Sequence, residues 1–138
     1  MKPEKNPNVN QKASSFTRSF ESEDKITPEV LKAFNFDSPK QLIEFNTDQL
    51  TAKCPFNGLR DFGDLTVTYH PLEGKCIELK SFKEYLFSFE DVGMYQENLT
   101  KRIYTDLKEL LKTDSIEVRT VYKVRGGIET ACTEGEIF

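Results

Sequence analysis

The chain has 138 residues, a formal net charge of −4, 37% hydrophobic residues and 30% charged residues, which is the size and composition of one globular domain. The negative charge disfavours non-specific binding to nucleic acid. No apolar run approaches the ~20 residues that span a bilayer, and the first residues lack the apolar stretch of a signal peptide. We therefore expect a cytoplasmic protein with no membrane partner.

Three cysteines (Cys54, Cys76 and Cys132) and a single histidine (His70) limit the available chemistry. An odd number of cysteines without a CxxC motif argues against a disulfide framework and against a cysteine zinc site. One histidine leaves metal catalysis few ligands, although Asp and Glu remain available for a hard cation. We expect no metal site.

The first part of the chain predicts an arm, a helix and a strand. Residues 1–24 are polar, so we expect a flexible arm, with residues 25–138 as the single folded domain. A threonine N-cap followed by proline at the first helical position predicts a short helix over residues 26–34. Alternating apolar residues predict a strand over residues 41–50.

The rest of the chain groups strands and helices separately. Residues 64–71 and 75–80 are β-rich runs around a glycine-containing turn, which predicts a hairpin. Apolar spacing of three and four residues predicts two consecutive helices between residues 81 and 111, and two further strands are expected between residues 115 and 134. The order ββααββ predicts an α+β domain, an antiparallel sheet with two helices on one face.

The segment CPFNGLRDFG, residues 54–63, places a thiol and a carboxyl in one turn. Pro55 favours an extended backbone at Cys54, and a turn at Gly58 can bring Asp61 back towards it. A free cysteine with a pKa of ~8.5 is only partly thiolate at neutral pH, so a nucleophilic cysteine needs a nearby base or positive charge. Cys54 and Asp61 are thus a candidate nucleophile and proton carrier. An ordinary loop with a capping aspartate is the alternative. The other two cysteines fall in strand patterns and are expected in the core.

The segment ELKSFKEY, residues 78–85, begins a predicted helix with two lysines. Lys80 and Lys83 are three residues apart, so their ammonium groups can converge on one anion, with Ser81 and free backbone amides as further donors. Phosphate suits such a site. Arg125, followed by two glycines that allow close backbone approach, is a third cation. A solvated amphipathic helix would explain the lysines equally.

Three motifs, CPFNGLRDFG, CIELKSFKEYLFSF and RGG, in this order and at these separations, closely resemble the NADPH-dependent 7-cyano-7-deazaguanine reductases. These are the QueF-type nitrile reductases of queuosine biosynthesis, and the Glu-Leu-Lys-Ser-aromatic-Lys stretch is their signature. The resemblance runs from about Thr51 to Gly127. It implies a tunnel fold, in which subunits assemble into homo-oligomers with active sites between chains.

The resemblance also implies a role for each matching residue. Cys54 would add to the nitrile carbon of the deazaguanine to form a covalent thioimide, and Asp61 would move the protons. Two hydrides from NADPH would then give the aminomethyl base, while Glu97 would bind the N–H edge of the base. The remaining implied residues are Gln96, Glu78 and Ser81 for the substrate, and Lys80, Lys83, Arg125 and Gly126 for the phosphates of the cofactor.

The chain departs from the family pattern at Gln96, where the family has histidine before the glutamate. Glutamine can hydrogen-bond a substrate but cannot carry a proton at neutral pH. Two other classes stay open. One is an amidine-forming transferase like the archaeal QueF-like proteins, which acts on the same nitrile within tRNA without NADPH and would make nucleic acid a partner. The other is a non-catalytic purine or pterin binder. The intact ELKSFK disfavours the first, and the pairing of Cys54 with Asp61 disfavours the second.

Overall fold

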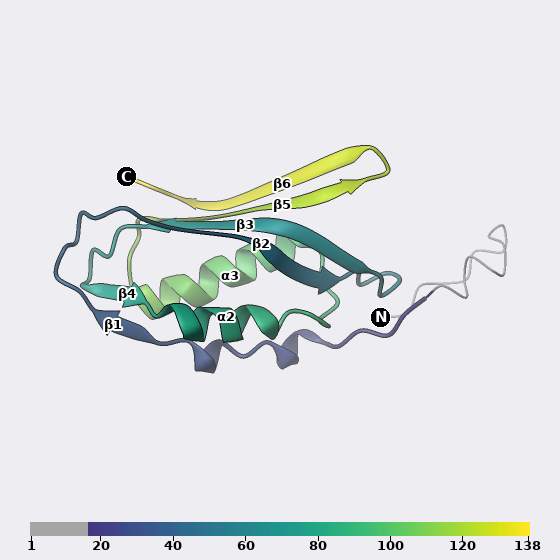
Figure 1. Ribbon diagram of the computed structural model, residues 1–138, viewed down its shortest axis with the longest axis horizontal. Helices are drawn as coiled ribbons and strands as arrows, with labels where there is room; N and C mark the ends of the chain where they lie inside the picture. The colour runs from purple at the N-terminus through teal and green to yellow at the C-terminus, as the bar shows by residue number, and fades with distance from the viewer. Residues whose placement is uncertain (1–16) are drawn as a thin grey trace.

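The computed structural model describes residues 17–138 as a curved antiparallel sheet with helices on one face (Figure 1). Its four strands lie in the order β2-β3-β5-β6. They are β2 (Ile43–Lys53), β3 (Arg60–Tyr69), β5 (Ile116–Arg125) and β6 (Ile128–Glu136). Two helices, α2 (Leu79–Phe87) and α3 (Gln96–Leu111), lie beneath the sheet. Among the described helices, none has both the length and the apolar character needed to cross a membrane.

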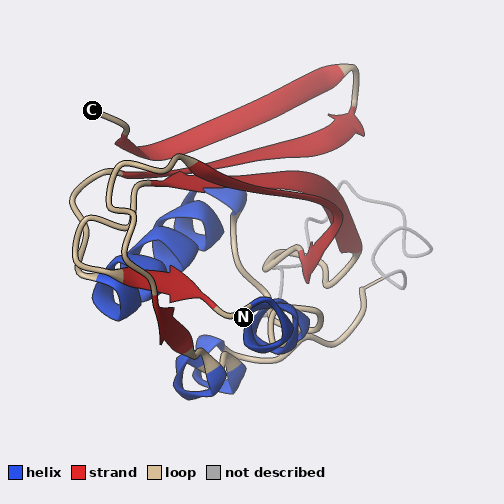
Figure 2. Ribbon diagram, turned by 60° about the vertical axis from the view of Figure 1, so that its left-hand side comes forward, coloured by secondary structure: helices blue, strands red, loops and turns tan. Residues whose placement is uncertain are grey.

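The α+β class with an antiparallel sheet is confirmed, and the core lies where the helices meet the sheet. Leu99, Ile103 and Leu107 of α3 are fully buried, because residues four apart lie on one face of a helix. They belong to one apolar cluster with Val67 of β3 and Val118 of β5. Figure 2 shows the same layering from the side, with both helices on one face of the strands. This core fixes α3 against the sheet.

The predicted hairpin of residues 64–71 with residues 75–80 is wrong. Strand β4 (Lys75–Ile77) pairs instead with β1 (Ala33–Asn35) in a separate antiparallel pair. Both edges of β3 are already occupied, one by β2 and the other by β5. A side chain makes the remaining link, because the buried Tyr69 hydroxyl accepts a hydrogen bond from the Ile77 backbone N–H at 2.9 Å.

The predicted helix over residues 26–34 is also wrong. The chain makes two short 3₁₀ turns, η1 (Glu23–Lys25) and η2 (Pro28–Val30), and then enters β1. Pro28 begins η2 as expected, but the next turn is lost because Leu31 is already extended, at φ −62° and ψ 134°. Lys32 then pairs with the start of α2, where its N–H donates to Ser81 Oγ at 2.9 Å.

Residues 1–16 of the expected arm lie outside the described residues, whereas the N-terminal segment, residues 17–25, packs on the domain. The Arg18 N–H donates to the Asn57 carbonyl in the β2–β3 loop at 2.6 Å. The Gly93 N–H, in the turn before α3, donates to the Glu21 carbonyl at 2.9 Å. The N-terminal segment therefore joins the loop that carries the thiol to the turn that leads into α3.

We predict that Gly58→Ala destabilises the protein through the N-terminal segment. Gly58 has φ +73°, and an added Cβ would lie 1.8 Å from the Arg18 carbonyl oxygen. The loss in unfolding free energy should therefore exceed the roughly 1–2 kcal/mol of a left-handed residue alone. Gly127→Ala is the matched control, since Gly127 has φ +79° with nothing within 4 Å of an added Cβ. If urea denaturation gave the same loss of unfolding free energy for both variants, the N-terminal segment would not be in close contact with the loop at Gly58.

Candidate active site

The loop between β2 and β3 is a tight turn that presents Cys54. The Cys54 N–H donates to the Leu59 carbonyl and the Gly58 N–H donates to the Cys54 carbonyl, each at 2.8 Å. Asn57 closes the turn from inside, because its Oδ1 accepts from the Leu59 N–H at 2.9 Å. The positive φ of Gly58 is required for this turn, and glycine adopts it at little cost. The thiol of Cys54 is free and half-buried.

Asp61 lies on the inward side of β3, next to this loop. Burial alternates along β3, so Asp61 points inward while its neighbour Arg60 points out. The Asp61 carboxylate accepts a hydrogen bond from Arg125 Nη1 of β5 at 2.6 Å. The two partners differ in exposure, since the side chain of Arg125 is 53% exposed and that of Asp61 only 11%. The buried member of the pair is thus the carboxyl.

Burial raises the pKa of Asp61 above its ordinary value, because desolvation penalises the ionised form. Arg125 opposes this rise through its charge and its hydrogen bond. The protonation state of Asp61 therefore depends on two opposing effects, which are burial and the interaction with the half-exposed Arg125 side chain. A carboxyl with a raised pKa keeps its proton to higher pH than an exposed aspartate, which suits a proton carrier.

The first turn of α3 presents Gln96 and Glu97. Glu97 is exposed at the helix N-terminus, where the helix dipole favours a negative charge. Gln96 is only 4% exposed, and its Nε2 donates to the Thr130 carbonyl at 2.9 Å and to Thr120 Oγ1 at 3.1 Å. Because these bonds fix the amide nitrogen towards the sheet, Oε1 is left without a hydrogen-bond partner among residues 17–138.

These side chains surround one hollow of about 220 Å³. Its lining consists of Cys54, Pro55, Asp61, Met94, Tyr95, Gln96, Glu97, Arg125 and Thr130. Residues that carry a thiol, two carboxyls, an amide and a guanidinium therefore line one space. They come from the β2–β3 loop, from the start of α3 and from strands β3, β5 and β6, so that residues distant in the chain share one site.

The two predicted phosphate-binding lysines do not line this hollow. Helix α2 begins beside β4, at the end of the sheet away from the β2–β3 loop (Figure 1). Lys83 lines a separate groove of about 450 Å³ between α2 and β2, and Lys80 is exposed. A single chain therefore does not bring Lys80 and Lys83 together with Arg125.

The prediction of free amides at the start of α2 is wrong, because Glu78 occupies them. The Glu78 carboxylate accepts from the Lys80 N–H at 2.6 Å and from the Ser81 N–H at 3.0 Å, as an N-cap. Ser81 is only 3% exposed, and its hydroxyl donates to the Glu78 carbonyl at 2.8 Å. Within one chain both side chains hold the helix start in place.

Tyr122 of β5 also belongs to this region, although the sequence predicted only that it lies in a strand between residues 115 and 134. Its ring packs over Gly63, where an added Cβ would lie 2.6 Å from the ring, and 5.5 Å beneath the Arg125 guanidinium. Burial raises the pKa of the Tyr122 hydroxyl, and the charge of Asp61 adds to the rise. The hydroxyl has no hydrogen-bond partner in the described part of the chain. Gly63 was the available signal, because glycine inside a strand often marks close approach.

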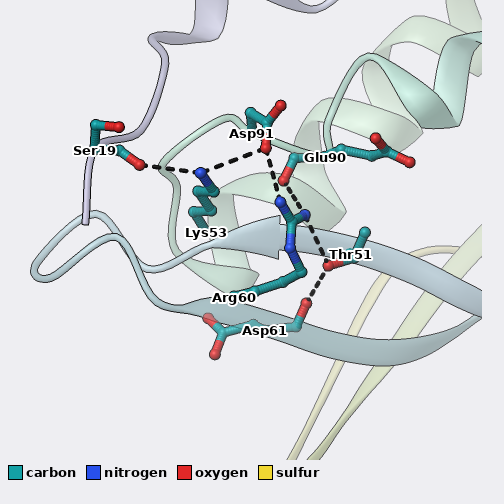
Figure 3. Close-up of polar contacts among 7 residues, drawn as sticks. All are labelled: Ser19, Thr51, Lys53, Arg60, Asp61, Glu90 and Asp91. Carbon is teal, nitrogen blue, oxygen red and sulfur yellow. Dashed lines mark hydrogen bonds and ion pairs between the residues drawn. The ribbon is translucent and has the colours of Figure 1, made fainter. Parts of the chain in front are cut away.

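An ion-pair network lies on the outer side of the hairpin formed by β2 and β3 (Figure 3). Arg60 donates to Asp91 Oδ1 at 2.8 Å, and Lys53 Nζ lies 3.4 Å from the same oxygen. Lys53 also donates to the Ser19 carbonyl of the N-terminal segment at 3.1 Å. The hydrogen bond from Arg60 holds the pKa of Asp91 below its ordinary value. In Figure 3 the Asp61 carboxylate points away from this network, so the network anchors the hairpin and leaves that carboxylate to the hollow.

Comparison with known proteins bears on the same residues. A family model described as "QueF-like protein" matches residues 60–136, which is more than half of the chain. The chain belongs to this family. The resemblance that the motifs indicated is therefore confirmed, and the family match includes both Asp61 and Arg125.

Two relatives of this family member carry the name NADPH-dependent 7-cyano-7-deazaguanine reductase. The protein of Thermotoga petrophila is 47% identical over 126 residues, covering 91% of this chain and 92% of the relative. That of Chlorobium chlorochromatii is 41% identical over 102 residues, covering 72% and 87%. A crystal structure of the archaeosine synthase QueF-Like in the apo form matches with a TM-score of 0.65 at 20% identity, covering 72% of this chain and 96% of that one. At this identity the match shows a shared fold.

We predict that Tyr122→Phe leaves the stability unchanged or raises it by up to about 1–3 kcal/mol, the cost of a buried hydroxyl without a partner. The substitution keeps the ring, so no cavity forms. Tyr69→Phe is the matched control, because the buried Tyr69 hydroxyl accepts a hydrogen bond from Ile77, and its loss should lower the stability by ~1 kcal/mol. Thermal unfolding that showed a larger loss for Tyr122→Phe than for Tyr69→Phe would contradict this account.

Proposed function

We propose that this chain reduces the nitrile of 7-cyano-7-deazaguanine to 7-aminomethyl-7-deazaguanine with NADPH, as a step of queuosine biosynthesis. The observation that carries the proposal is the single hollow that Cys54, Asp61, Gln96, Glu97 and Arg125 line. The names of the two relatives at 47% and 41% identity support the same activity.

Covalent catalysis explains why a thiol and a carboxyl share the hollow. A nitrile carbon is a weak electrophile, and addition of the Cys54 sulfur forms a C–S bond while the nitrile nitrogen takes a proton. The product is a thioimide on Cys54, whose carbon accepts hydride more readily. NADPH, when bound, supplies the hydrides. The first hydride and a proton would give a tetrahedral adduct, from which the C–S bond breaks to release the imine and return the thiol of Cys54. A second hydride, from a second NADPH, and a second proton would give the amine. Asp61 is the group in the hollow whose pKa is raised, so it is the candidate carrier of these protons.

Recognition of the base rests on acceptors at the start of α3. A 7-deazaguanine presents N–H donors along one edge, and the Glu97 carboxylate suits two of them. Gln96 Oε1 is a second acceptor for the base, because the amide nitrogen is bonded to Thr120 and Thr130 while the buried oxygen has no partner among residues 17–138 and would need only a small shift of the side chain to reach the hollow. Gln96 thus orients the base without carrying a proton, and proton transfer falls to Asp61.

The cofactor phosphates suit Arg125, Lys80 and Lys83, with Gly126 allowing close approach at the tip of the β5–β6 hairpin. Arg125 is half-exposed at the edge of the hollow, whereas the lysines lie on α2 outside it. We therefore infer that the lysines come from a second copy of the chain, in a tunnel-fold homo-oligomer with active sites between subunits. Strands β2 and β6 are the outer strands of the sheet, and the groove beside β2 includes the exposed Leu79 and Phe87. Exposed apolar patches of this kind are typical of interfaces.

The covalent step gives a direct test of the function. Without NADPH, the nitrile base should increase the mass of the protein by the mass of the ligand, and Cys54→Ala should abolish the increase. Cys132→Ala is the matched control, because Cys132 is also a free, half-buried cysteine but does not line the hollow.

With NADPH, the nicotinamide absorbance should fall, and Asp61→Asn should slow this by roughly 10²–10⁴. An adduct that survives in Cys54→Ala would refute the proposal. Consumption of the nitrile within tRNA without NADPH oxidation would indicate the transferase.

Sites shared between chains can be tested by mixing two inactive variants. Cys54→Ala lacks the nucleophile, and the double variant Lys80→Ala with Lys83→Ala lacks the two lysines. If one chain supplies the thiol and another the lysines, co-refolded mixtures should regain NADPH oxidation that neither variant shows alone. Mixing Cys54→Ala with Asp61→Asn is the control and should restore no activity, because both residues line the hollow of one chain. A mixture of the first pair that stays inactive would contradict a shared site.

A further inference from the structure

The ion pair between Arg125 and Asp61 joins a position at the end of a strand to one inside a strand that is paired on both edges. Asp61 lies within β3, which is paired along both edges. Arg125 is the last residue of β5, past a register shift between Tyr122 and Arg125 in its pairing with β6. The guanidinium is half-exposed while the carboxylate is nearly buried. Arg125 is therefore the partner that can leave.

The hairpin tip leaves room for such a movement. Gly126 and Gly127 follow Arg125 at φ +59° and +79°, and apart from their chain neighbours no atom of residues 17–138 lies within 4 Å of an ideal Cβ position at either glycine. The side chains of Val124 and Ile128 are exposed by 59% and 69%. Because the tip has open space at both glycines and exposed residues on either side of them, Arg125 can turn away from Asp61, giving up its contact with the Tyr122 ring, without opening the core.

We propose that Arg125 is a positioning residue for Asp61 as well as a phosphate ligand: it holds the carboxylate ionised until a cofactor phosphate draws the guanidinium away, and Asp61 then takes up a proton. The inference rests on the proposed function, since it needs NADPH as the phosphate donor. Proton balance is simple, because one proton from solvent is taken up at Asp61 as the ion pair breaks. The acid form is thereby created in the complex that holds the hydride donor.

The charges around Asp61 give the direction of the change. Arg125 of β5 is the one cation among the residues that line the hollow. The other titratable groups of the lining are Cys54 of the loop, Tyr95 just before α3 and Glu97 of α3, with Tyr122 of β5 behind the lining. None of these carries a positive charge. When Arg125 leaves, burial acts without opposition, and the pKa of Asp61 rises.

The first test measures Asp61 itself and does not depend on the reductase reaction. Protein labelled with ¹³C at the aspartate carboxyl is titrated by NMR, with Asp61→Asn identifying the resonance. In Arg125→Ala the midpoint should lie about one to three pH units above that of the wild type, the usual effect of removing an adjacent arginine. Lys123→Ala is the matched control, because Lys123 is an exposed cation of β5 that lies outside the hollow. An unchanged midpoint in Arg125→Ala would overturn the proposal.

The second test adds saturating NADPH without the nitrile base, so that no reduction occurs. The wild-type midpoint of Asp61 should rise towards that of Arg125→Ala, and the variant should show little further rise. Inorganic phosphate at the same concentration controls for ionic strength. A midpoint that NADPH does not move overturns the coupling. Separately, NADPH oxidation with the nitrile base tests the proposed function, so an active enzyme with an unmoved midpoint would retain the function and lose this inference.

Discussion

The pairing of β3 along both of its edges decides which side chains reach the hollow. Ala52 lies opposite Asp61 in the ladder with β2, and Gly63 lies opposite Tyr122 in the ladder with β5. Because side chains alternate across a strand, a slip of one residue would turn Arg60 inward and Asp61 outward. The apolar inner face of β3, with Leu65, Val67 and Tyr69 buried, makes that slip costly. The core thus sets the position of a carboxyl that contributes nothing to packing.

The site contains buried polar groups without hydrogen-bond partners and a nearly buried acid, which are rare in protein cores. Gln96 Oε1 and the Tyr122 hydroxyl are buried without partners in the described chain, and Asp61 is a nearly buried acid. Each such group lowers the stability of the fold. Their grouping around one hollow, while the neighbouring apolar cluster is fully packed, agrees with the rule that local violations of good packing gather where a protein acts.

Local patterns predicted α2, α3 and the turn between Cys54 and Asp61, and they failed for the helix expected over residues 26–34 and for the pairing of β4. The spacing of Leu99, Ile103 and Leu107 is enough to define α3. The turn at residues 72–74 also had the composition of a hairpin, but β3 pairs with β2 and β5, and β4 pairs with β1, which is distant in the chain. Glu78 was expected to bind a substrate, and within one chain its carboxylate caps its own helix. The lysines of α2 were predicted to join Arg125, and the sheet separates them within one chain.

The N-terminal segment is held by main-chain atoms. Its bonds to Asn57, Asp91 and Gly93 all run between backbone N–H and carbonyl groups, so the side chains at positions 18 and 21 can vary without breaking them. Proline is the exception, because it has no N–H to donate. Related chains can therefore vary at these two positions while keeping the path of the backbone, whereas position 20 is constrained because the Phe20 ring lies against Gly93.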